Sequence, residues 1–321
     1  MSKMIETQPE GQEPTAKFDR DELVRGWRVY ENHVPRLLPI LKFSAKTDMG
    51  QVRENNEDKF DFYEPEEAGI LAERGSIYAV ADGIGGAVAG QIASEMTLKQ
   101  VISGYYDNPS SDIVTALRES VIAANDRIHA LAQMIPERRG MGATLVAAVF
   151  IEDKAIIAHV GDSRAYRMRN GELEQITHDH SWVEEQVRAG AISRSEAEMS
   201  PFKNVITRSV GATQNVAPDF CEETAAPGDT YLLCSDGLTG HVKDDEIATI
   251  LSEHSPSEAA RQLIELANAR GGKDNITVFI LSLRALIPYG ESAFESNSIP
   301  PSSPSEAGAV ASSWRNLFGL H

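Results

Sequence analysis

Acidic side chains stand at the ends of several short apolar runs in this sequence, and carboxylates at such positions could bind divalent cations. Four of the runs, 77–81, 155–160, 231–235 and 276–281, have the composition and length of buried strands, and 59–63 is a further predicted strand. The end of a buried strand fixes a side chain at the rim of a domain, where a cleft can form. The acids are Glu57 and Asp58 before 59–63, Asp82 after 77–81, Asp162 after 155–160, Asp236 after 231–235 and Asp274 before 276–281.

These six carboxylates can converge only if cations neutralise them, because like charges at short range disfavour the ionised form. An all-oxygen ligand set selects Mg²⁺ or Mn²⁺ over zinc. Each acid alone has a simpler interpretation, since Asp82-Gly83 and Asp236-Gly237 are also ordinary turn dipeptides. The pattern therefore predicts a metal centre on condition that the fold brings the acids together.

The composition limits the class of protein and its partners. The chain has 321 residues, 41% hydrophobic and 24% charged, which is ordinary for a globular protein with a sizeable core. Its net charge of −18 argues against nucleic acid or an anionic membrane as the main partner. Cys221 and Cys234 provide neither a disulfide framework nor a zinc pattern. Without a signal peptide or an apolar run of membrane-spanning length, we expect a cytoplasmic protein, with the monomer as the default state.

The chain divides into three segments. Residues 1–40 form a polar extension, in which helical spacing predicts a short helix packed on the domain, with docking of a partner as the alternative. Residues 41–285 form one globular block. Residues 286–321 are rich in Pro and Ser and are expected to be disordered, because they bury too little apolar surface to order themselves. The helical spacing in the extension rests on Leu23, Trp27, Tyr30 and Val34.

The order of the predicted elements favours an α+β fold over a βαβ alternation. Two consecutive helices, over 98–105 and 113–131, follow the early strands. Several strands come next, then one helix over 260–267 and a last strand. Arg169-Asn170-Gly171 joins two runs and predicts a hairpin turn. This series suits antiparallel sheets with helices outside.

Six motifs then place the chain beside a known family. In their order and approximate spacing it resembles the metal-dependent protein phosphatases, the PPM or type 2C family, and in particular its bacterial members. The resemblance implies a four-layer α-β-β-α sandwich of two antiparallel sheets flanked by helices. The motifs are Arg53-Glu54-Asn55-Asn56-Glu57-Asp58, Ala81-Asp82-Gly83-Ile84-Gly85-Gly86, Gly142-Ala143-Thr144-Leu145, Gly161-Asp162-Ser163-Arg164, Ser235-Asp236-Gly237-Leu238 and Lys273-Asp274-Asn275.

The resemblance also implies which residues hold the cations. Asp82 would bridge two cations, Mn²⁺ or Mg²⁺, and the carbonyl of Gly83 would contact one of them. Their remaining ligands would be Glu57, Asp58, Asp236 and Asp274.

Two further residues acquire roles in the same way. Asp162, together with Asp236, would hold a third cation, as in bacterial members; the alternative is a turn acid that buttresses Arg164. Arg53 would clamp the phosphate, because its planar fork can grip two phosphate oxygens at once.

The implied activity is hydrolysis of phosphoserine and phosphothreonine in proteins. Water activated by two cations would attack phosphorus in line, with Arg53, Asp82 and Asp236 as the catalytic residues and no phosphoenzyme. The partners would be phosphorylated proteins and a cognate serine/threonine kinase. The general acid is left open, because Ile84 stands where many eukaryotic relatives have His. Water on a cation is the first candidate, and His178 and His180, in a mobile flap over 178–210, are the second; a solvated or structural pair is the alternative.

Three rival interpretations are each opposed by particular residues. A catalytically weak phosphoprotein-binding regulatory module of the same fold would lack ligands or Arg53, and this chain lacks none. Gly161-Asp162-Ser163 is similar to a serine-protease stretch, but Arg164 replaces the glycine expected next. Gly83-x-Gly85 begins like a dinucleotide-binding loop, but Val88 takes the place of its third glycine.

Overall fold

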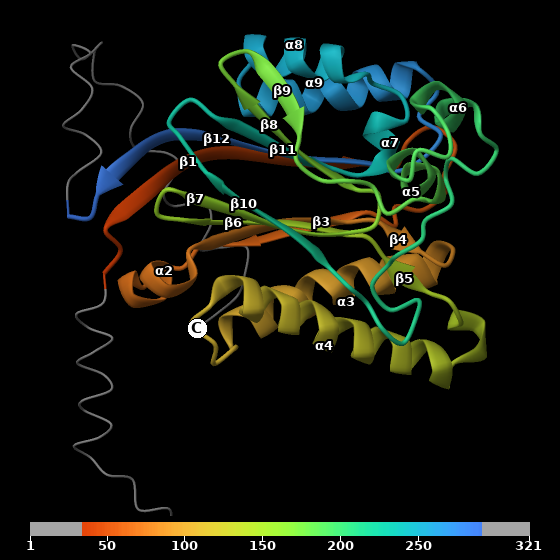
Figure 1. Cartoon of the computed structure of the whole chain (residues 1–321), viewed down its shortest axis with the longest axis horizontal. Coiled ribbons are helices and arrows are strands. Elements are labelled where there is room, and N and C mark those ends of the chain that lie inside the picture. The colour runs from red at the N-terminus through yellow and green to blue at the C-terminus, as the bar shows by residue number, and fades with distance from the viewer. Residues whose placement is uncertain (1–33, 291–321) are drawn as a thin grey trace, which may run out of the picture. The chain divides into compact units, whose positions relative to one another are not determined.

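The computed structural model of this protein describes residues 34–290. The helix predicted around Leu23 and Trp27, and nearly all of the predicted tail, lie outside the described residues. Within them, two five-stranded sheets form the centre of the fold and helices cover their outer faces (Figure 1). This arrangement confirms the predicted α+β sandwich of two antiparallel sheets flanked by helices.

Both sheets consist of antiparallel neighbours, and a short two-stranded ladder accompanies them. The first sheet has the order β1 (Leu37–Asp48), β12 (Ile276–Pro288), β11 (Thr230–Cys234), β8 (Arg164–Arg169) and β9 (Glu172–Gln175). The second has the order β10 (Asp219–Thr224), β7 (Lys154–Val160), β6 (Leu145–Ile151), β3 (Ser76–Ala81) and β2 (Lys59–Tyr63). The ladder joins β4 (Gly83–Ile84) to β5 (Gly142–Ala143).

The central strands are mostly apolar because both of their faces are covered. In β3 every residue is buried. Ile77 and Ala79 pack in the cluster under the helices, whereas Tyr78 and Val80 pack in the cluster between the sheets. Successive side chains of a strand point to opposite faces, so one continuous apolar run fills two layers of core.

Helices form the outer layers of the sandwich. α3 (Ala87–Tyr106) and α4 (Ile113–Met134) cover the second sheet, and α8 (Asp244–Glu253) and α9 (Pro256–Ala269) cover the first (Figure 1). The sequence predicted one helix before the last strand, but two long ones are present. They separate at Ser255-Pro256, because proline fits the first turn of a new helix and cannot continue the old one. The shorter helices are α2 (Ala68–Arg74), η1 (Pro136–Arg138), α5 (Trp182–Arg188), α6 (Arg194–Met199) and α7 (Asp236–Thr239).

The first and last strands extend the globular block beyond the predicted 41–285. β1 and β12 pair along their length, with Leu37 opposite Pro288. Their mutual hydrogen bonding carries both strands past the apolar runs that marked the block in the sequence. The predicted hairpin turn is confirmed between β8 and β9, where Asn170 and Gly171 both have positive φ, as a type I′ turn requires.

No helix among residues 34–290 is long and apolar enough to cross a membrane.

Candidate metal centre

The pairing of β2 with β3 brings Asp58 and Asp82 together. β2 and β3 are antiparallel, with Lys59 opposite Ala81. Because the start of one strand meets the end of the other, Asp58 and Asp82 are neighbours at one end of the second sheet.

The first sheet brings its own acids to this end. Cys234 lies opposite Val278, so Asp236 after β11 and Asp274 before β12 lie at the same end of the first sheet. Asp162 lies in the turn between β7 of one sheet and β8 of the other. The acids that the sequence singled out thus gather from both sheets at one end of the sandwich.

Asn275 holds the loop that carries Glu57 and Arg53. Its side-chain oxygen accepts a hydrogen bond from the backbone N–H of Glu57 at 2.8 Å. Its amide donates to the carbonyls of Met49 and Asn55, both at 2.9 Å. Although it lies inside one of the six motifs, no role was predicted for it from the sequence. A buried, fully bonded Asn beside a candidate ligand is the feature that identifies it.

Two hydroxyl residues were missed in the same way. Ser235, next to Asp236, donates from Oγ to Asp58 Oδ2 at 2.7 Å, across the two sheets. The Thr144 hydroxyl accepts from the backbone N–H of Asp82 at 2.9 Å, and its oxygen lies 2.7 Å from that of Ser163. Ser235 adjoins Asp236 in the sequence and Thr144 lies inside one of the six motifs, and these positions are the signal that the sequence offered.

Burial and mutual repulsion both act on these carboxyls. Burial, opposed in part by its hydrogen bonds, raises the pKa of Asp58 to about 7. Burial and the charge of Asp274 raise the pKa of Asp236 to about 6. The pKa values of Asp82 and Asp162 lie well above the ordinary range, first through burial and then through neighbouring acids. Such a cluster resists ionisation unless positive charge enters it.

The donor chemistry fits divalent cations. One oxygen of each of Asp58, Asp162 and Asp236 is buried without a hydrogen-bond partner. Buried polar atoms in folded proteins are nearly always bonded, and carboxylate oxygens are the ligands that Mg²⁺ and Mn²⁺ prefer. Within residues 34–290, no three His, Cys, Asp or Glu side chains are already arranged to hold a metal ion.

Close backbone contacts shape the part of the site around Gly83. A Cβ atom on Gly83 would lie 2.1 Å from the carbonyl oxygen of Gly90, in the first turns of α3. A Cβ atom on Gly90 would lie 1.8 Å from Glu57 Oε2 and 2.9 Å from the Gly83 carbonyl oxygen. The absence of a side chain at Gly90 therefore leaves the space that the Glu57 carboxylate occupies, beside the carbonyl of Gly83 that is predicted to be a ligand.

This packing makes Gly90→Ala an informative substitution. Alanine favours a helix interior over glycine by roughly 1 kcal/mol. Here its methyl group would displace the Glu57 carboxylate, so we expect Mn²⁺ affinity, measured by calorimetric titration, to fall about tenfold or more. Gly104→Ala, later in α3, is the control and should leave Mn²⁺ affinity unchanged. Equal Mn²⁺ affinity in both variants would contradict the assigned position of Glu57.

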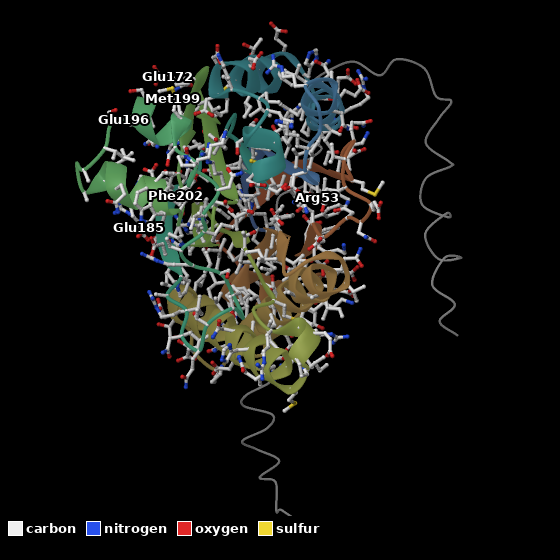
Figure 2. All side chains as sticks on the ribbon, turned by 90° about the vertical axis from the view of Figure 1, so that its right-hand side faces the viewer. Arg53, Glu172, Glu185, Glu196, Met199 and Phe202 are labelled. Carbon is white, nitrogen blue, oxygen red and sulfur yellow. The ribbon has the colours of Figure 1, made fainter. Side chains whose placement is uncertain are left out.

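Arg53 reaches the cluster from its exposed side. Its Nη2 atom donates to Asp274 Oδ2 at 2.6 Å, and its side chain is 48% exposed. This bond raises the pKa of Arg53 above its already high ordinary value. Figure 2 looks onto this end of the sandwich and shows Arg53 on it. Its remaining donors are thus placed for a ligand arriving from solvent.

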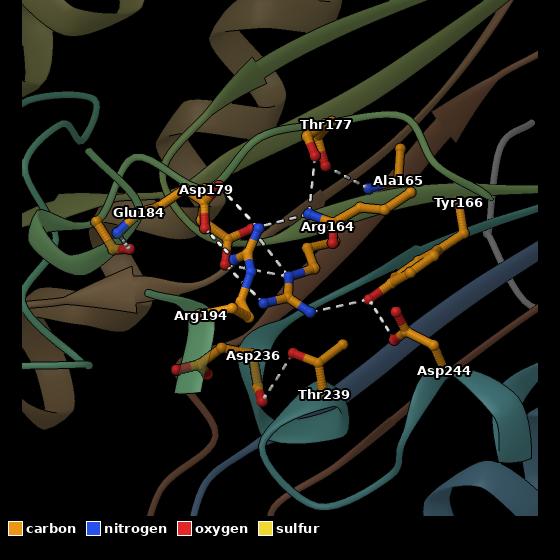
Figure 3. Close-up of polar contacts among 12 residues, drawn as sticks. Arg164, Ala165, Tyr166, Thr177, Asp179, Glu184, Arg194, Asp236, Thr239 and Asp244 are labelled. Carbon is orange, nitrogen blue, oxygen red and sulfur yellow. Dashed lines mark hydrogen bonds and ion pairs between the residues drawn. The ribbon is translucent and has the colours of Figure 1, made fainter. Parts of the chain in front are cut away.

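The ion pair of Arg164 bears on the role of Asp162. Arg164 donates to both oxygens of Asp179, at 2.7–3.1 Å, and to the Tyr166 hydroxyl at 3.0 Å (Figure 3). The carboxylate that buttresses Arg164 is therefore that of Asp179, whereas Asp162 keeps a buried, unbonded oxygen. These contacts favour a ligand role for Asp162 over that of a turn acid.

The two flap histidines differ from each other. His178 is exposed, whereas His180 is only 2% exposed. His180 Nδ1 accepts from the N–H of Gly161 at 3.1 Å, and its Nε2 lies 3.1 Å from Asp219. Burial lowers the pKa of His180, so the ring is neutral near pH 7. Its contacts tie the base of the flap to the Asp162 turn.

The segment over 178–210 forms an excursion beside the site. It contains α5 and α6, and it is closed at its base by a bridge between Ser181 and Ile206. Figure 2 shows Met199 and Phe202 at its outer side. Its mobility and its part in substrate choice stay predictions.

Comparison with known proteins connects this geometry to a family. The model described as protein phosphatase 2C matches residues 44–276. The serine/threonine phosphatase stp of Listeria welshimeri is 39% identical over 253 residues, which cover 77% of this chain and 98% of the relative. The solved serine/threonine phosphatase of S. agalactiae is 38% identical with a TM-score of 0.71, covering 76% of this chain and 100% of that one.

A further solved structure contains metal. It is the catalytic domain of the serine/threonine protein phosphatase PstP in complex with 2 manganese ions, 37% identical with a TM-score of 0.66, and it covers 78% of this chain and all of that one. These matches confirm the resemblance drawn from the motifs. The chain belongs to the protein phosphatase 2C family.

Proposed function

We propose that this chain hydrolyses phosphoserine and phosphothreonine in proteins with two divalent cations, Mn²⁺ or Mg²⁺. The observation that carries the proposal is the convergence of acids from both sheets, with buried carboxylate oxygens left unbonded in Asp58, Asp162 and Asp236. The names of the relatives and the manganese in the PstP structure support the same function.

The residues of the chain divide the work of the reaction. Asp82 and Asp236, with Glu57, Asp58, Asp274 and the Gly83 carbonyl, would hold the cations. When bound, these cations would supply Lewis acidity and lower the pKa of water so that it can attack phosphorus in line. Arg53 would leave Asp274 for the phosphate and grip two of its oxygens through its planar fork. The buried and neutral state of His180 favours a structural role for it over proton donation.

The test of this function is hydrolysis of p-nitrophenyl phosphate and of a phosphothreonine peptide with Mn²⁺, with and without EDTA. We expect both activities to require the cation and to disappear in Asp82→Ala. Activity that survives both EDTA and this substitution would reject the metal mechanism. A folded, Mn²⁺-binding protein without any activity would instead favour the regulatory-module alternative.

Arg53→Lys tests the phosphate clamp, because it keeps the charge and removes the fork. One lost charge-assisted hydrogen bond corresponds to a fall in kcat/KM of about 10- to 100-fold. Stabilisation by Mn²⁺, followed as the Tm gain on adding the ion, should change little, since Arg53 is not a ligand. An unchanged kcat/KM for the phosphopeptide would remove Arg53 from substrate binding.

Asp162→Ala tests the third cation. We expect hydrolysis to fall about tenfold or more while two Mn²⁺ ions still bind in a calorimetric titration. Asp179→Asn is the control, because it breaks the Arg164 pair next to Asp162 without removing the proposed ligand. Loss of all Mn²⁺ binding in Asp162→Ala, or equal effects of the two substitutions, would contradict a separate third site.

The cellular setting completes the proposal. We place this activity in the cytoplasm, with the monomer as the default state, and membership of the family supports a cognate serine/threonine kinase as the opposing enzyme. Phosphoproteomics of a strain lacking this protein would identify its substrates through the phosphorylated sites that accumulate.

A further inference from the structure

A cavity of about 420 Å³ lies between the first sheet and the corner where α8 ends and α9 begins. Figure 1 shows these two helices over the first sheet. The hairpin between β8 and β9, the helix corner at Ser255 and Pro256, and Ser282 of β12 all line the cavity. Ser282 lies roughly 20 Å along β12 from Ile276, where the strand leaves the metal centre. The cavity is therefore separate from the metal centre.

Four neighbouring strands present one row of side chains to this cavity. In register across β1, β12, β11 and β8, the row consists of Lys42, Ser282, Thr230 and Met168, and all four line the cavity. Leu281, next to Ser282, packs between the two sheets. Because successive side chains of a strand point to opposite faces, Ser282 points to the helix side. The sheet is thus polar at three of these four positions, on the face that is otherwise covered by apolar contacts with helices.

The hydroxyl of Ser282 is the observation that indicates a ligand. Only 6% of this residue is exposed, yet its hydroxyl forms no hydrogen bond with any residue of 34–290. The hydroxyl of Thr230, directly opposite on β11, is likewise unbonded within the described chain. Buried hydroxyl groups in folded proteins are nearly always hydrogen-bonded. These two hydroxyls can therefore serve a polar group that enters the cavity.

The charge of the cavity favours an anion. Its lining includes Lys42, His254 and Arg284, and no Asp or Glu from the described residues. Lys42 and Arg284 are exposed and form no ion pair within residues 34–290. Arg284 is the extra residue of a bulge opposite Ile40 and Leu41, and a bulge can re-aim a side chain. In a chain of net charge −18, a cavity lined by bases alone concentrates anions locally.

The beginning of α9 adds partial positive charge. Ser255, the N-cap residue, lines the cavity, and its side chain forms no capping hydrogen bond. The first backbone N–H groups of the helix therefore keep their capacity to bind an anion. Two acids close in sequence are already paired outside the cavity, Glu258 with Arg261 and Asp229 with Arg169.

We infer that this cavity binds an oxyanion, namely the phosphate group of a small molecule. Lys42 and Arg284 would neutralise its charge, and the hydroxyl of Ser282 would donate to one of its oxygens. Leu251 and Ile280 also line the cavity, so an organic group attached to the phosphate can be accommodated. Free phosphate and a small organic monoester share this chemistry. The site goes beyond the proposed function and does not depend on it.

Thermal unfolding of the full-length protein in EDTA, with inorganic phosphate replacing chloride at equal ionic strength, tests the site. At phosphate concentrations about tenfold above the dissociation constant, the Tm should rise by about 3 °C or more. Lys42→Gln, Arg284→Gln and Ser282→Ala should each lose most of this rise. Lys46→Gln is the matched control, because it removes the same charge from β1 outside the cavity and should keep the full rise. No rise in the wild type, or an equal rise in Lys42→Gln and Lys46→Gln, would overturn the inference.

Ser282→Ala also separates ligand binding from a structural role of the hydroxyl. In chloride alone its Tm should equal or exceed that of the wild type, because the substitution removes no hydrogen bond. A Tm in chloride that falls by several degrees would mean that the hydroxyl stabilises the free protein, and this result would contradict the assigned role. The test stands even if the variants of the two basic residues do not fold.

Calorimetric titration in EDTA with inorganic phosphate and with phenyl phosphate distinguishes the two sources of the group. Tighter binding of phenyl phosphate would assign the site to an organic monoester, and equal affinity would assign it to the phosphate ion. In both cases Ser282→Ala should weaken binding about tenfold, as expected for one lost hydrogen bond to a charged group. Affinities that are the same in the wild type, Ser282→Ala and Lys42→Gln would place the anion elsewhere and overturn the inference.

Discussion

Replacing Asp236 with asparagine is expected to reduce p-nitrophenyl phosphate hydrolysis about 10²- to 10³-fold or more in saturating Mn²⁺. The amide is nearly isosteric but carries no charge, so it is a poor ligand for a hard cation. Steady-state kinetics across a range of Mn²⁺ concentrations should show weaker Mn²⁺ binding, as a higher Mn²⁺ concentration at half-maximal rate, together with the lower kcat.

The same substitution should spare or even increase the stability of the metal-free fold. The pKa of Asp236 is raised to about 6, so at pH 8 its ionised form opposes folding by at most on the order of 3 kcal/mol. In EDTA at pH 8 the Tm of Asp236→Asn should therefore equal or exceed that of the wild type. This combination of lost activity and retained stability separates a functional acid from a structural one.

Asp229 supplies the matched control for this comparison. It is also a buried acid, but Arg169 pairs with it at 2.6 and 2.7 Å. Asp229→Asn leaves a partly buried guanidinium without its countercharge, so it should lower the Tm while the folded fraction keeps its Mn²⁺ dependence. A metal-free Tm that falls as far in Asp236→Asn as in Asp229→Asn would contradict the repulsion inferred at the site.

Most of the strands and helices, and the list of candidate acids, could be predicted from local patterns in the sequence. Buried strands between two covered faces are almost entirely apolar, as in β3, and this made the strand ends and their acids recognisable in the sequence. The Asn170-Gly171 turn was equally local. Helix α8 escaped notice because its buried face contains little more than Ile247 and Leu251.

Contacts between distant segments could not be read in this way. The bond from Ser235 to Asp58 joins residues 177 positions apart, and it depends on how one sheet lies against the other. For His180 the sequence left open a proton donor, a solvated residue and a structural one, and the structure packs it against His159 with ring centroids 4.5 Å apart. The family resemblance supplied the convergence of the acids, whereas these supporting contacts required the structure.

The acid cluster also makes the stability of the protein depend on pH in a direction that cations should reverse. Folding raises the pKa of Asp58 to about 7 and that of Asp236 to about 6, from ordinary values of 3.8. At pH values between the ordinary pKa of 3.8 and the raised pKa values, the folded state binds more protons than the unfolded state. The stabilising contribution of these groups is therefore complete below about pH 4 and disappears as the pH rises to about 7.

Thermal unfolding in EDTA and in Mn²⁺ across this range should show the reversal. The metal-free Tm should fall between pH 5 and pH 8, whereas the gain on adding Mn²⁺ should grow, to on the order of 10 °C, because the ionised carboxylates are the ligands. Asp58→Asn should flatten the fall in EDTA, since it removes the group whose pKa is shifted to about 7. A metal-free Tm that rises over this interval, or a Mn²⁺ gain that is independent of pH, would mean that the carboxylates do not form one electrostatically coupled cation site.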